Sequence, residues 1–244
     1  MRVGVYGLGR FGKFWAGLLT QKFGPVLGYS RNRKDDLPAG VQQVSEDELL
    51  QADVLFFCVS ISSFEDVIKA VAPRLKPGMT VFDTCSVKMY PVKVMKSSLP
   101  HGISVIASHP MFGPDSGRES VQGLPMVMHP VSVSQSDFSY WRGIFREYGM
   151  EVIEMSPEEH DHQAAYSQGV THFIGRVLQG IHLQKSLIGT VGYHKLLEIV
   201  EQTCNDPLQL FYDLQRYNPY TSEMRTAVLE SFQQTLGMLK SDET

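Results

Sequence analysis

A histidine held in front of a proline is the residue of this sequence best suited to proton chemistry. His109 follows the apolar run Ile103–Ala107 and precedes Pro110 in the stretch SHPMFGP. Proline disfavours helical angles in the residue before it, so we expect the ring in a loop after a strand. A neutral imidazole, with an ordinary pKa of about 6.5, accepts a proton at neutral pH. We predict that His109 is the catalytic base toward a substrate hydroxyl; the alternative is a histidine that only caps the strand or packs in the core.

Two further polar side chains follow the preceding apolar run, Thr80–Phe82. Ser86 and Lys88 lie in the stretch DTCSVK. Parallel sheets expose their ligands at the carboxyl ends of the strands, so both segments are expected at one edge. We predict that Ser86 orients either the ring of His109 or the substrate hydroxyl, and that Lys88 attracts a substrate carboxylate.

A glycine pattern near the N-terminus is typical of a dinucleotide site. Gly7, Gly9 and Gly12 form G-x-G-x-x-G directly after an apolar run. The pattern permits a tight turn, a close approach to a pyrophosphate, and close packing of helix on strand. The alternative is a glycine turn that binds no ligand. The predicted cofactor contacts of this loop are Gly7, Leu8, Gly9, Arg10, Phe11 and Gly12.

The end of the second apolar run indicates which dinucleotide binds. An NAD site places an acid about 20 residues after the glycines, where it holds the ribose hydroxyls. Here the stretch GYSRNRK, 28–34, contains no acid. Guanidinium groups bind a 2′-phosphate through paired hydrogen bonds, so we predict NADP. The predicted contacts are Ser30, Arg31 and Arg33, with Val59 and Ser60 at the end of a later apolar run.

These residues require a sheet to position them. Short apolar runs alternate with helical stretches from Met1 to about Met155, which predicts an α/β fold with a Rossmann-like, doubly wound, mostly parallel sheet over 1–155. The predicted strands are Val3–Tyr6, Val26–Tyr29, Val54–Val59, Thr80–Phe82, Ile103–Ala107, Pro125–His129 and Glu151–Met155.

The pattern of the sequence changes at Ser156. The stretch SPEE offers a helix N-cap followed by proline at the first helical position. Helices are predicted at 158–183, 192–203 and 222–239, which makes 156–244 an all-helical domain. So small a helical unit would struggle to cover its own apolar faces, and we predict that it is a substrate and dimerisation domain of a homodimer.

Composition excludes several classes of partner. The net charge is −4 without a basic block, so we expect neither nucleic acid nor membrane as a partner. The three cysteines have no framework spacing and no apolar run is long enough for a membrane helix, which predicts a cytoplasmic protein. His160 and His162 stand two apart on a helix and face different sides, so no metal site is predicted.

Three stretches resemble the prephenate/arogenate dehydrogenase family. They are SVK at 86–88, HPMFGPDSG at 109–117 and EMSPEEHDHQAAYSQGVTHFIGRVL at 154–178, and the HPMFGP form most resembles plant-type arogenate dehydrogenases. The resemblance implies NADP-dependent oxidative decarboxylation of a cyclohexadienyl substrate in tyrosine biosynthesis. It places the family's histidine, which hydrogen-bonds the ring hydroxyl, at His109 and its supporting serine at Ser86.

The resemblance also raises the question of what binds the substrate carboxylates. Candidates besides Lys88 are Gln168, Thr171 and His172. Many bacterial members carry an arginine in a Thr-Arg pair where this chain has Leu197-Glu198. Arg176, Arg216 and Arg225 are candidates to replace this arginine as the carboxylate partner. Each of them is equally well explained as a structural residue at the surface or at an interface.

Glu119 is the predicted selector between two substrates of the family. Plant-type arogenate enzymes carry an acid there, which would pair with the ammonium group of arogenate; the alternative is a glutamate that faces solvent. We therefore expect arogenate as the better substrate. Three alternatives stay open: a prephenate-preferring enzyme, another NADP-linked dehydrogenase or reductase, and an NADP sensor without catalysis.

Overall fold

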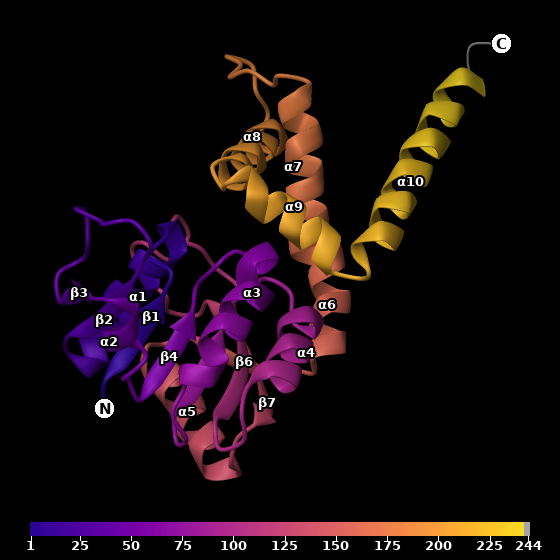
Figure 1. The fold of residues 1–244 in the computed structure, drawn as a ribbon. Helices are drawn as coiled ribbons and strands as arrows, with labels where there is room; N and C mark the ends of the chain where they lie inside the picture. Colours follow the sequence, from indigo (N-terminus) through magenta and orange to yellow (C-terminus); the bar gives the residue numbers. More distant parts are fainter. Residues whose placement is uncertain (242–244) are drawn as a thin grey trace. The chain divides into compact units, whose positions relative to one another are not determined.

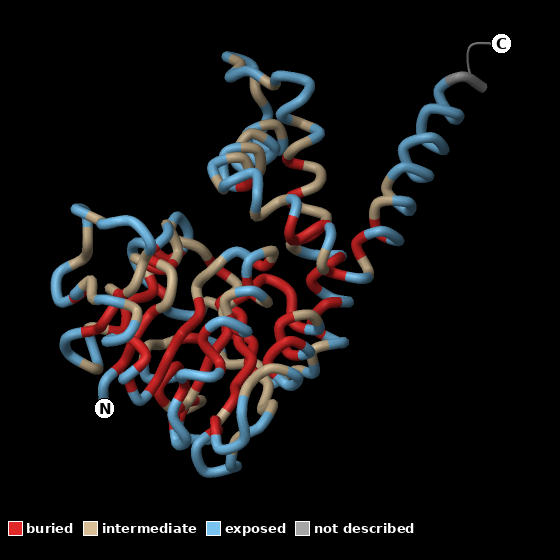
Figure 2. Tube along the Cα trace, viewed as in Figure 1, coloured by how far each residue is buried: buried red, intermediate tan, exposed pale blue. Residues whose placement is uncertain are grey.

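The chain forms two compact units that divide between His160 and Asp161. The computed structural model describes residues 1–241. The division falls slightly after the predicted boundary at 155/156, because His160 contacts His109 of the first unit. Figure 2 shows buried residues concentrated along the strands of the first unit.

Strands and helices alternate through the first unit (Figure 1). In chain order they are β1 (Val3–Tyr6), α1 (Arg10–Phe23), β2 (Val26–Tyr29), β3 (Val41–Gln43), α2 (Glu46–Leu49), β4 (Val54–Phe57), α3 (Ile61–Val71), the 3-10 turn η1 (Ala72–Arg74), β5 (Thr80–Asp83), α4 (Met89–Ser98), β6 (Ser104–Pro110), β7 (Pro125–Ser132), α5 (Gln135–Glu147) and β8 (Glu151–Glu154).

All these strands join one sheet in the order β3-β2-β1-β4-β5-β6-β7-β8. The pairs from β3 through β6 are parallel, β7 runs antiparallel to β6, and β8 is parallel to β7. The predicted Rossmann-like, mostly parallel sheet is confirmed. Strand order reverses direction at β1, so the carboxyl ends of β1 and β4 flank the switch point at which such sheets bind ligands.

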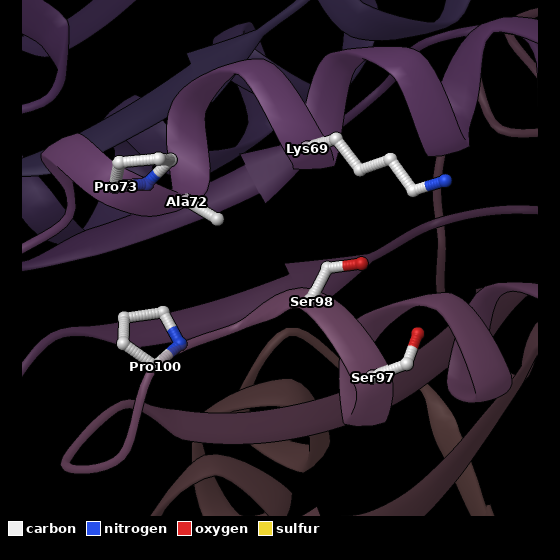
Figure 3. Close-up of a pocket in the computed structure, with 6 residues that line it drawn as sticks. All are labelled: Lys69, Ala72, Pro73, Ser97, Ser98 and Pro100. Atoms are coloured by element: carbon white, nitrogen blue, oxygen red, sulfur yellow. The ribbon is translucent and has the colours of Figure 1, made fainter.

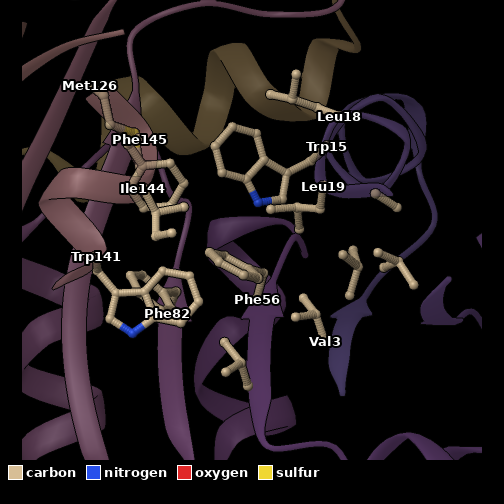
Figure 4. Close-up of a cluster of buried hydrophobic side chains, with 14 of the residues drawn as sticks. Val3, Trp15, Leu18, Leu19, Phe56, Phe82, Met126, Trp141, Ile144 and Phe145 are labelled. Carbon is tan, nitrogen blue, oxygen red and sulfur yellow. The ribbon is translucent and has the colours of Figure 1, made fainter. Parts of the chain in front are cut away.

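An aromatic cluster fixes α1 and α5 against one face of the sheet (Figure 4). The ring of Trp15 on α1 lies 5.8 Å from that of Phe145 on α5, measured between centroids. Beneath them Phe56 of β4 stacks on Phe82 of β5 at 4.5 Å. Buried aromatic rings contribute more packing energy than any other side chains, so this cluster holds the start of α1 in place.

Two details of the sheet differ from the sequence expectations. The short strand β3 was not predicted. The strand β6 continues through Pro110, so His109 lies within a strand and not in a loop after it. The extended backbone that Pro110 imposes on His109 is strand geometry, and His109 pairs with Val127 of β7.

The second unit is helical, as predicted. It begins within α6 (Pro157–Ala164). The elements that follow are the π-helical turn η2 (Ala165–Gly169), α7 (Val170–Gly180), α8 (Val191–Cys204), α9 (Leu208–Tyr217) and α10 (Thr221–Ser241). The helix predicted over 158–183 ends at Gly180 and contains the π turn, and α9 was not predicted. Over residues 1–241, every helix is too short or too polar to cross a bilayer.

Candidate functional site

The three glycines after β1 have the geometry that a pyrophosphate needs. Gly7 has φ of +107°, and a Cβ atom there would lie 2.5 Å from the Cys58 carbonyl oxygen. A Cβ on Gly12 would lie 1.8 Å from the Gly7 oxygen, whereas one on Gly9 meets no atom within 4 Å. The first turn of α1 carries no acid. The loop therefore fits a dinucleotide, with Gly9 open at a helix N-terminus.

Two side chains of this loop serve packing. Leu8 is fully buried, and a Cβ added to Gly28 of β2 would lie 2.7 Å from a Leu8 methyl carbon. Phe11 stacks on Trp15 with centroids 5.8 Å apart. Leu8 can therefore offer a cofactor only backbone atoms, whereas the contact at the half-buried Phe11 stays a prediction. Arg10 forms an ion pair with Asp115, and both side chains are partly exposed.

The predicted 2′-phosphate residues follow β2 directly. Arg31 and Arg33 are exposed, Ser30 is half-buried, and no acid stands at the end of β2. The Arg33 Nε lies 3.5 Å from a carboxylate oxygen of Asp35 in an exposed pair. Val59 and Ser60 connect β4 to α3, at the same edge of the sheet.

The side chain of His109 meets a second histidine that the sequence did not assign to the site. The Nδ1 atom of His109 lies 2.8 Å from Nε2 of His160, on the first turns of α6. Both residues are buried, with 3% and 2% of their surface exposed. This hydrogen bond fixes the orientation of the His109 ring and leaves its Nε2 as the atom for proton transfer.

Burial lowers the pKa of His109 well below 6.5, and the nearby His160 and Lys88 lower it further. A group in a low-dielectric interior resists gaining a charge, so His109 is neutral at neutral pH. A neutral imidazole is the form that accepts a proton.

Lys88 has a different role from the predicted one. Only 1% of Lys88 is exposed, and its ammonium forms an ion pair with the fully buried Asp83. Its Nζ also donates a hydrogen bond of 2.6 Å to the carbonyl oxygen of Ser108. Its charge is therefore neutralised inside the protein, and we correct its assignment as a substrate-carboxylate partner.

Asp83 ties the ends of β5 and β6 together. It accepts hydrogen bonds of 3.1 Å from the backbone N–H groups of Ser108 and Cys85. Burial raises the pKa of Asp83, and the Lys88 ammonium and the two N–H donors oppose that rise. Ser108 directly precedes His109, so this network anchors the backbone that carries the base.

Ser86 lies in the turn between β5 and α4 with a buried hydroxyl. Its Oγ atom forms no hydrogen bond with any residue in 1–241. Of the two predicted roles, orienting the ring of His109 belongs to His160 instead. A buried hydroxyl without a partner is costly, and a bound substrate hydroxyl would satisfy it.

The other predicted substrate residues lie in two separate places. Glu119 is exposed in the connection between β6 and β7. In the second unit, Gln168 belongs to the π turn, while Thr171 and His172 lie on the first turn of α7. The Oε1 atom of Gln168 and the Nδ1 atom of His172 are buried without a partner among the described residues. Burial lowers the pKa of His172 to about 4, and Arg176 contributes to the shift.

Two consecutive hydrogen bonds connect the π turn to Gln215 and, through it, to Arg225. The Nε2 atom of the buried Gln215 donates to the Gly169 carbonyl oxygen over 2.8 Å. Arg225 in turn donates to the Gln215 side-chain oxygen over 2.8 Å. Short π-helical turns within α-helices occur frequently at functional sites, and this one carries Gln168.

The three arginines that were sought as carboxylate binders have structural partners. Arg176 donates to the carbonyl oxygens of Thr203 and Asp206, and Arg225 also donates to that of Gln215. Arg216 lies over the ring of Tyr212 at 4.8 Å. None of them is therefore left as an evident replacement for the family's arginine.

The two histidines of the stretch EEHDHQ, for which no metal site was predicted, contact different partners. His160 contacts His109, whereas the ring of His162 stands edge-on to that of Tyr220, with centroids 5.1 Å apart. No group of three or more His, Cys, Asp or Glu side chains within the described part of the chain is arranged to hold a metal ion.

A surface pocket of about 360 Å³ lies away from all of these residues. Figure 3 shows it between the end of α3 with η1 and the end of α4. Its lining residues are Lys69, Ala72, Pro73, Ser97, Ser98 and Pro100. None of them carries a predicted function.

Two protein-family models and several curated relatives match this chain. Residues 17–154 match the family model of the prephenate dehydrogenase nucleotide-binding domain, and residues 177–244 match a model described as TYRAAT1-like, C-terminal domain. Arogenate dehydrogenase 1, chloroplastic, of Arabidopsis thaliana is 35% identical over 99% of this chain, and arogenate dehydrogenase 2, chloroplastic, of the same plant is 36% identical over 91%. This chain spans 39% and 65% of the lengths of those two relatives.

Solved structures share the fold. Prephenate dehydrogenase from A. aeolicus, in complex with hydroxyphenyl propionate and NAD+, superposes with a TM-score of 0.73 at 20% identity, over 99% of this chain and 90% of that one. Synechocystis arogenate dehydrogenase gives a TM-score of 0.68 at 18% identity, over 98% and 93%. The family model covers more than half of the chain, and the relatives match nearly all of it. This protein therefore belongs to the prephenate dehydrogenase family, with plant-type arogenate dehydrogenases among its relatives.

Proposed function

We propose that this protein catalyses NADP-dependent oxidative decarboxylation of arogenate in tyrosine biosynthesis, with prephenate as the alternative substrate. The observation that carries the proposal is the buried pair of His109, on β6, and His160, on α6, in the unit whose glycine turn after β1 fits a dinucleotide. A neutral base beside a nicotinamide site is what oxidation of a ring hydroxyl requires. The identity to two plant arogenate dehydrogenases supports the substrate class.

His109 takes the proton of the substrate hydroxyl. For Nε2 to accept it, the ring's own proton must reside on Nδ1, where it is donated to Nε2 of His160 over 2.8 Å. His160 is thus a positioning residue that selects the tautomer of the base. When the base becomes an imidazolium, the same hydrogen bond shares its charge with His160.

The cofactor site would hold NADP through two groups of atoms. The backbone from Gly7 to Gly12 faces the pyrophosphate, and the exposed Arg31 is suited to the 2′-phosphate. A bound nicotinamide supplies the acceptor for the hydride removed from the carbon that bears the hydroxyl. Loss of CO₂ then leaves an aromatic phenolate, which takes back the proton held by His109. Aromatisation drives the reaction, so the protein chiefly positions the ring and transfers one proton.

The substrate contacts follow from the chemistry of the side chains. The Ser86 hydroxyl is suited to the ring hydroxyl, and Gln168, Thr171 and His172 are suited to the carboxylates. His172 is neutral above pH about 4, so it would act as a hydrogen-bond donor and not as a cation. These neutral partners take the place of the arginine of bacterial relatives.

The choice of NADP over NAD is supported by the chain after β2. No acid stands where NAD sites place one, and Arg31 is exposed without an ion-pair partner among the described residues. The A. aeolicus relative was solved with NAD+, so the cofactor must be tested directly.

We also propose a cytoplasmic homodimer with no nucleic-acid or membrane partner. The three cysteines have no disulfide-framework spacing in the sequence, which suits a reducing compartment. Apolar side chains of α10 are exposed along its length, among them Leu229, Phe232, Leu236 and Leu239. A second copy of the helical unit would cover them.

The test is an assay of NADPH and NADH formation with arogenate and prephenate, in all four combinations. The proposal expects the highest kcat/KM with arogenate and NADP. Prephenate as the better substrate would establish the alternative within the family. Turnover of neither compound would overturn the proposal, and tight NADP binding without turnover would favour a sensor.

Glu119→Gln tests the selector within the same assay. Loss of a charge partner for the substrate ammonium costs roughly 2–5 kcal/mol in a closed site, so arogenate's kcat/KM should fall about 30-fold or more while that for prephenate rises. Glu119 is exposed in this structure, and equal changes for both substrates would show that it stays in solvent.

A further inference from the structure

The segment 30–34, which carries the predicted 2′-phosphate arginines, is held by one side chain from the neighbouring strand. Gln43, the last residue of β3, donates from Nε2 to the carbonyl oxygens of Ser30 and Asn32 over 3.2 and 3.0 Å. Its Oε1 atom accepts from the backbone N–H of Lys34 over 2.8 Å. A single amide thus contacts three alternate positions of the segment.

This segment has little else to order it. Among the described residues, 31–34 lie in no helix or strand and form no backbone–backbone hydrogen bond. Arg31, Asn32 and Arg33 are exposed, whereas Gln43 is half-buried. The conformation that places the two guanidinium groups therefore depends chiefly on Gln43.

Only an amide of this length satisfies all three partners. Two carbonyl oxygens require donors, and one N–H group requires an acceptor. A carboxylate offers acceptors alone, and an aliphatic side chain offers neither. The register explains the reach: Gln43 pairs with Gly28 of β2, just before the segment begins.

We propose that Gln43 is a positioning residue for cofactor selectivity: it holds 30–34 in the conformation in which Arg31 binds the 2′-phosphate. The inference rests on the proposed use of NADP. Gln43 need not touch the cofactor. Its loss would raise the KM for NADP, since an arginine on a disordered segment must be ordered at the moment of binding. NAD has no 2′-phosphate, so its KM should change little.

The chain offers a matched control. Gln42 is the same residue type on the same strand, but its side chain is exposed and has no hydrogen bond among the described residues. Gln42→Ala removes the same atoms from β3 as Gln43→Ala does, without touching the segment. A general weakening of β3 would affect both variants alike.

The experiment measures KM and kcat with NADP and with NAD for the full chain and four variants: Gln43→Ala, Gln43→Glu, Gln42→Ala and Arg31→Ala. Gln43→Ala should lower the preference for NADP about tenfold, the scale of one to two lost hydrogen bonds, with kcat unchanged. The near-isosteric Gln43→Glu should lower it at least as far, because a carboxylate cannot donate to the carbonyl oxygens of Ser30 and Asn32. Arg31→Ala should also lower the preference, and Gln42→Ala should keep it.

Three negative results are distinguishable. A parent protein without preference for NADP would overturn the proposed cofactor and, with it, this inference. A parent that prefers NADP and loses that preference in Arg31→Ala, but keeps it in both Gln43 variants, would overturn the role of Gln43 alone. Equal losses for NADP and NAD in the Gln43 variants would assign Gln43 to the fold and likewise overturn its role in selectivity.

Discussion

His109 combines burial, a fixed ring and an uncharged state, three properties that a base for a ring hydroxyl requires. Within residues 1–241, the side chain of His109 forms its hydrogen bond with His160. The depressed pKa means that the ring does not need to lose a proton before it can accept one. Its basicity is correspondingly modest, so in the proposed reaction the aromatisation that follows must draw the step forward.

Replacing the base tests this assignment. His109→Asn should bind NADP as the parent does and lower kcat by about 10²–10⁴-fold, the usual contribution of a general base. Equilibrium cofactor binding and steady-state rates measure the two effects separately. Parental activity in this variant would remove His109 from the mechanism.

The pH dependence follows from the direction of the shift. Protonation abolishes the base, and the pKa of His109 is lowered below 6.5, so activity should persist into more acidic solution than an ordinary histidine allows. The acid limb of kcat/KM, which reports the free enzyme, should therefore fall below pH about 6.5. A limb at or above that value would mean that the folded protein does not depress this pKa. His109→Asn, through its residual activity, should lack the limb.

Among the elements, the ends of β5 and β6 carry the buried ion pair of Asp83 and Lys88. Removing one partner of such a pair leaves an uncompensated charge and costs about 3–5 kcal/mol. Lys88→Met should therefore lower the free energy of unfolding by that amount in urea titrations. The double variant Asp83→Asn, Lys88→Met should recover part of the loss, and additive losses would show that the two side chains do not interact.

The sequence predicted most elements because their signals are local. The strands β1 and β2 are apolar runs beside a glycine pattern, and they appear with the predicted bounds. The strand β3 was missed because Val41-Gln42-Gln43 is short and polar, and its pairing with β2 is visible only in the sheet. Helix α9 was missed because it begins directly after Pro207 and is short.

The site was predicted in part for the same reason. The glycine loop can be recognised from the spacing of its glycines, and His109 from its neighbours in the sequence. The contact between His109 and His160 joins residues 51 positions apart, so local patterns cannot reveal it. A usable signal existed: the N-cap at Ser156 fixes the start of α6, and His160 then lies on its first turns. The burial of Lys88 was likewise invisible, because its partner Asp83 lies within a strand.

For the whole molecule, the exposed apolar residues of α10 make assembly the property to test. Phe232 and Leu236 are 50% and 57% exposed and stand one helical turn apart. The double variant Phe232→Glu, Leu236→Lys adds a favourable pair at that spacing and keeps the helix. In sedimentation, the parent should be a dimer and the variant a folded monomer, while Gln234→Ala on the same helix stays dimeric. A monomeric parent would contradict the proposed homodimer.

The π turn at 165–169 is one peptide longer than an α-helix needs. A bulge of this kind accommodates an insertion locally, so the helix on either side keeps its phase. Deleting a single residue there would join the flanks into an ordinary helix, with His172 still on the same face. Gln215, which donates to the Gly169 carbonyl at the end of this turn, would then face a shifted acceptor. The length of this segment is thus a variable that one insertion or deletion could change locally.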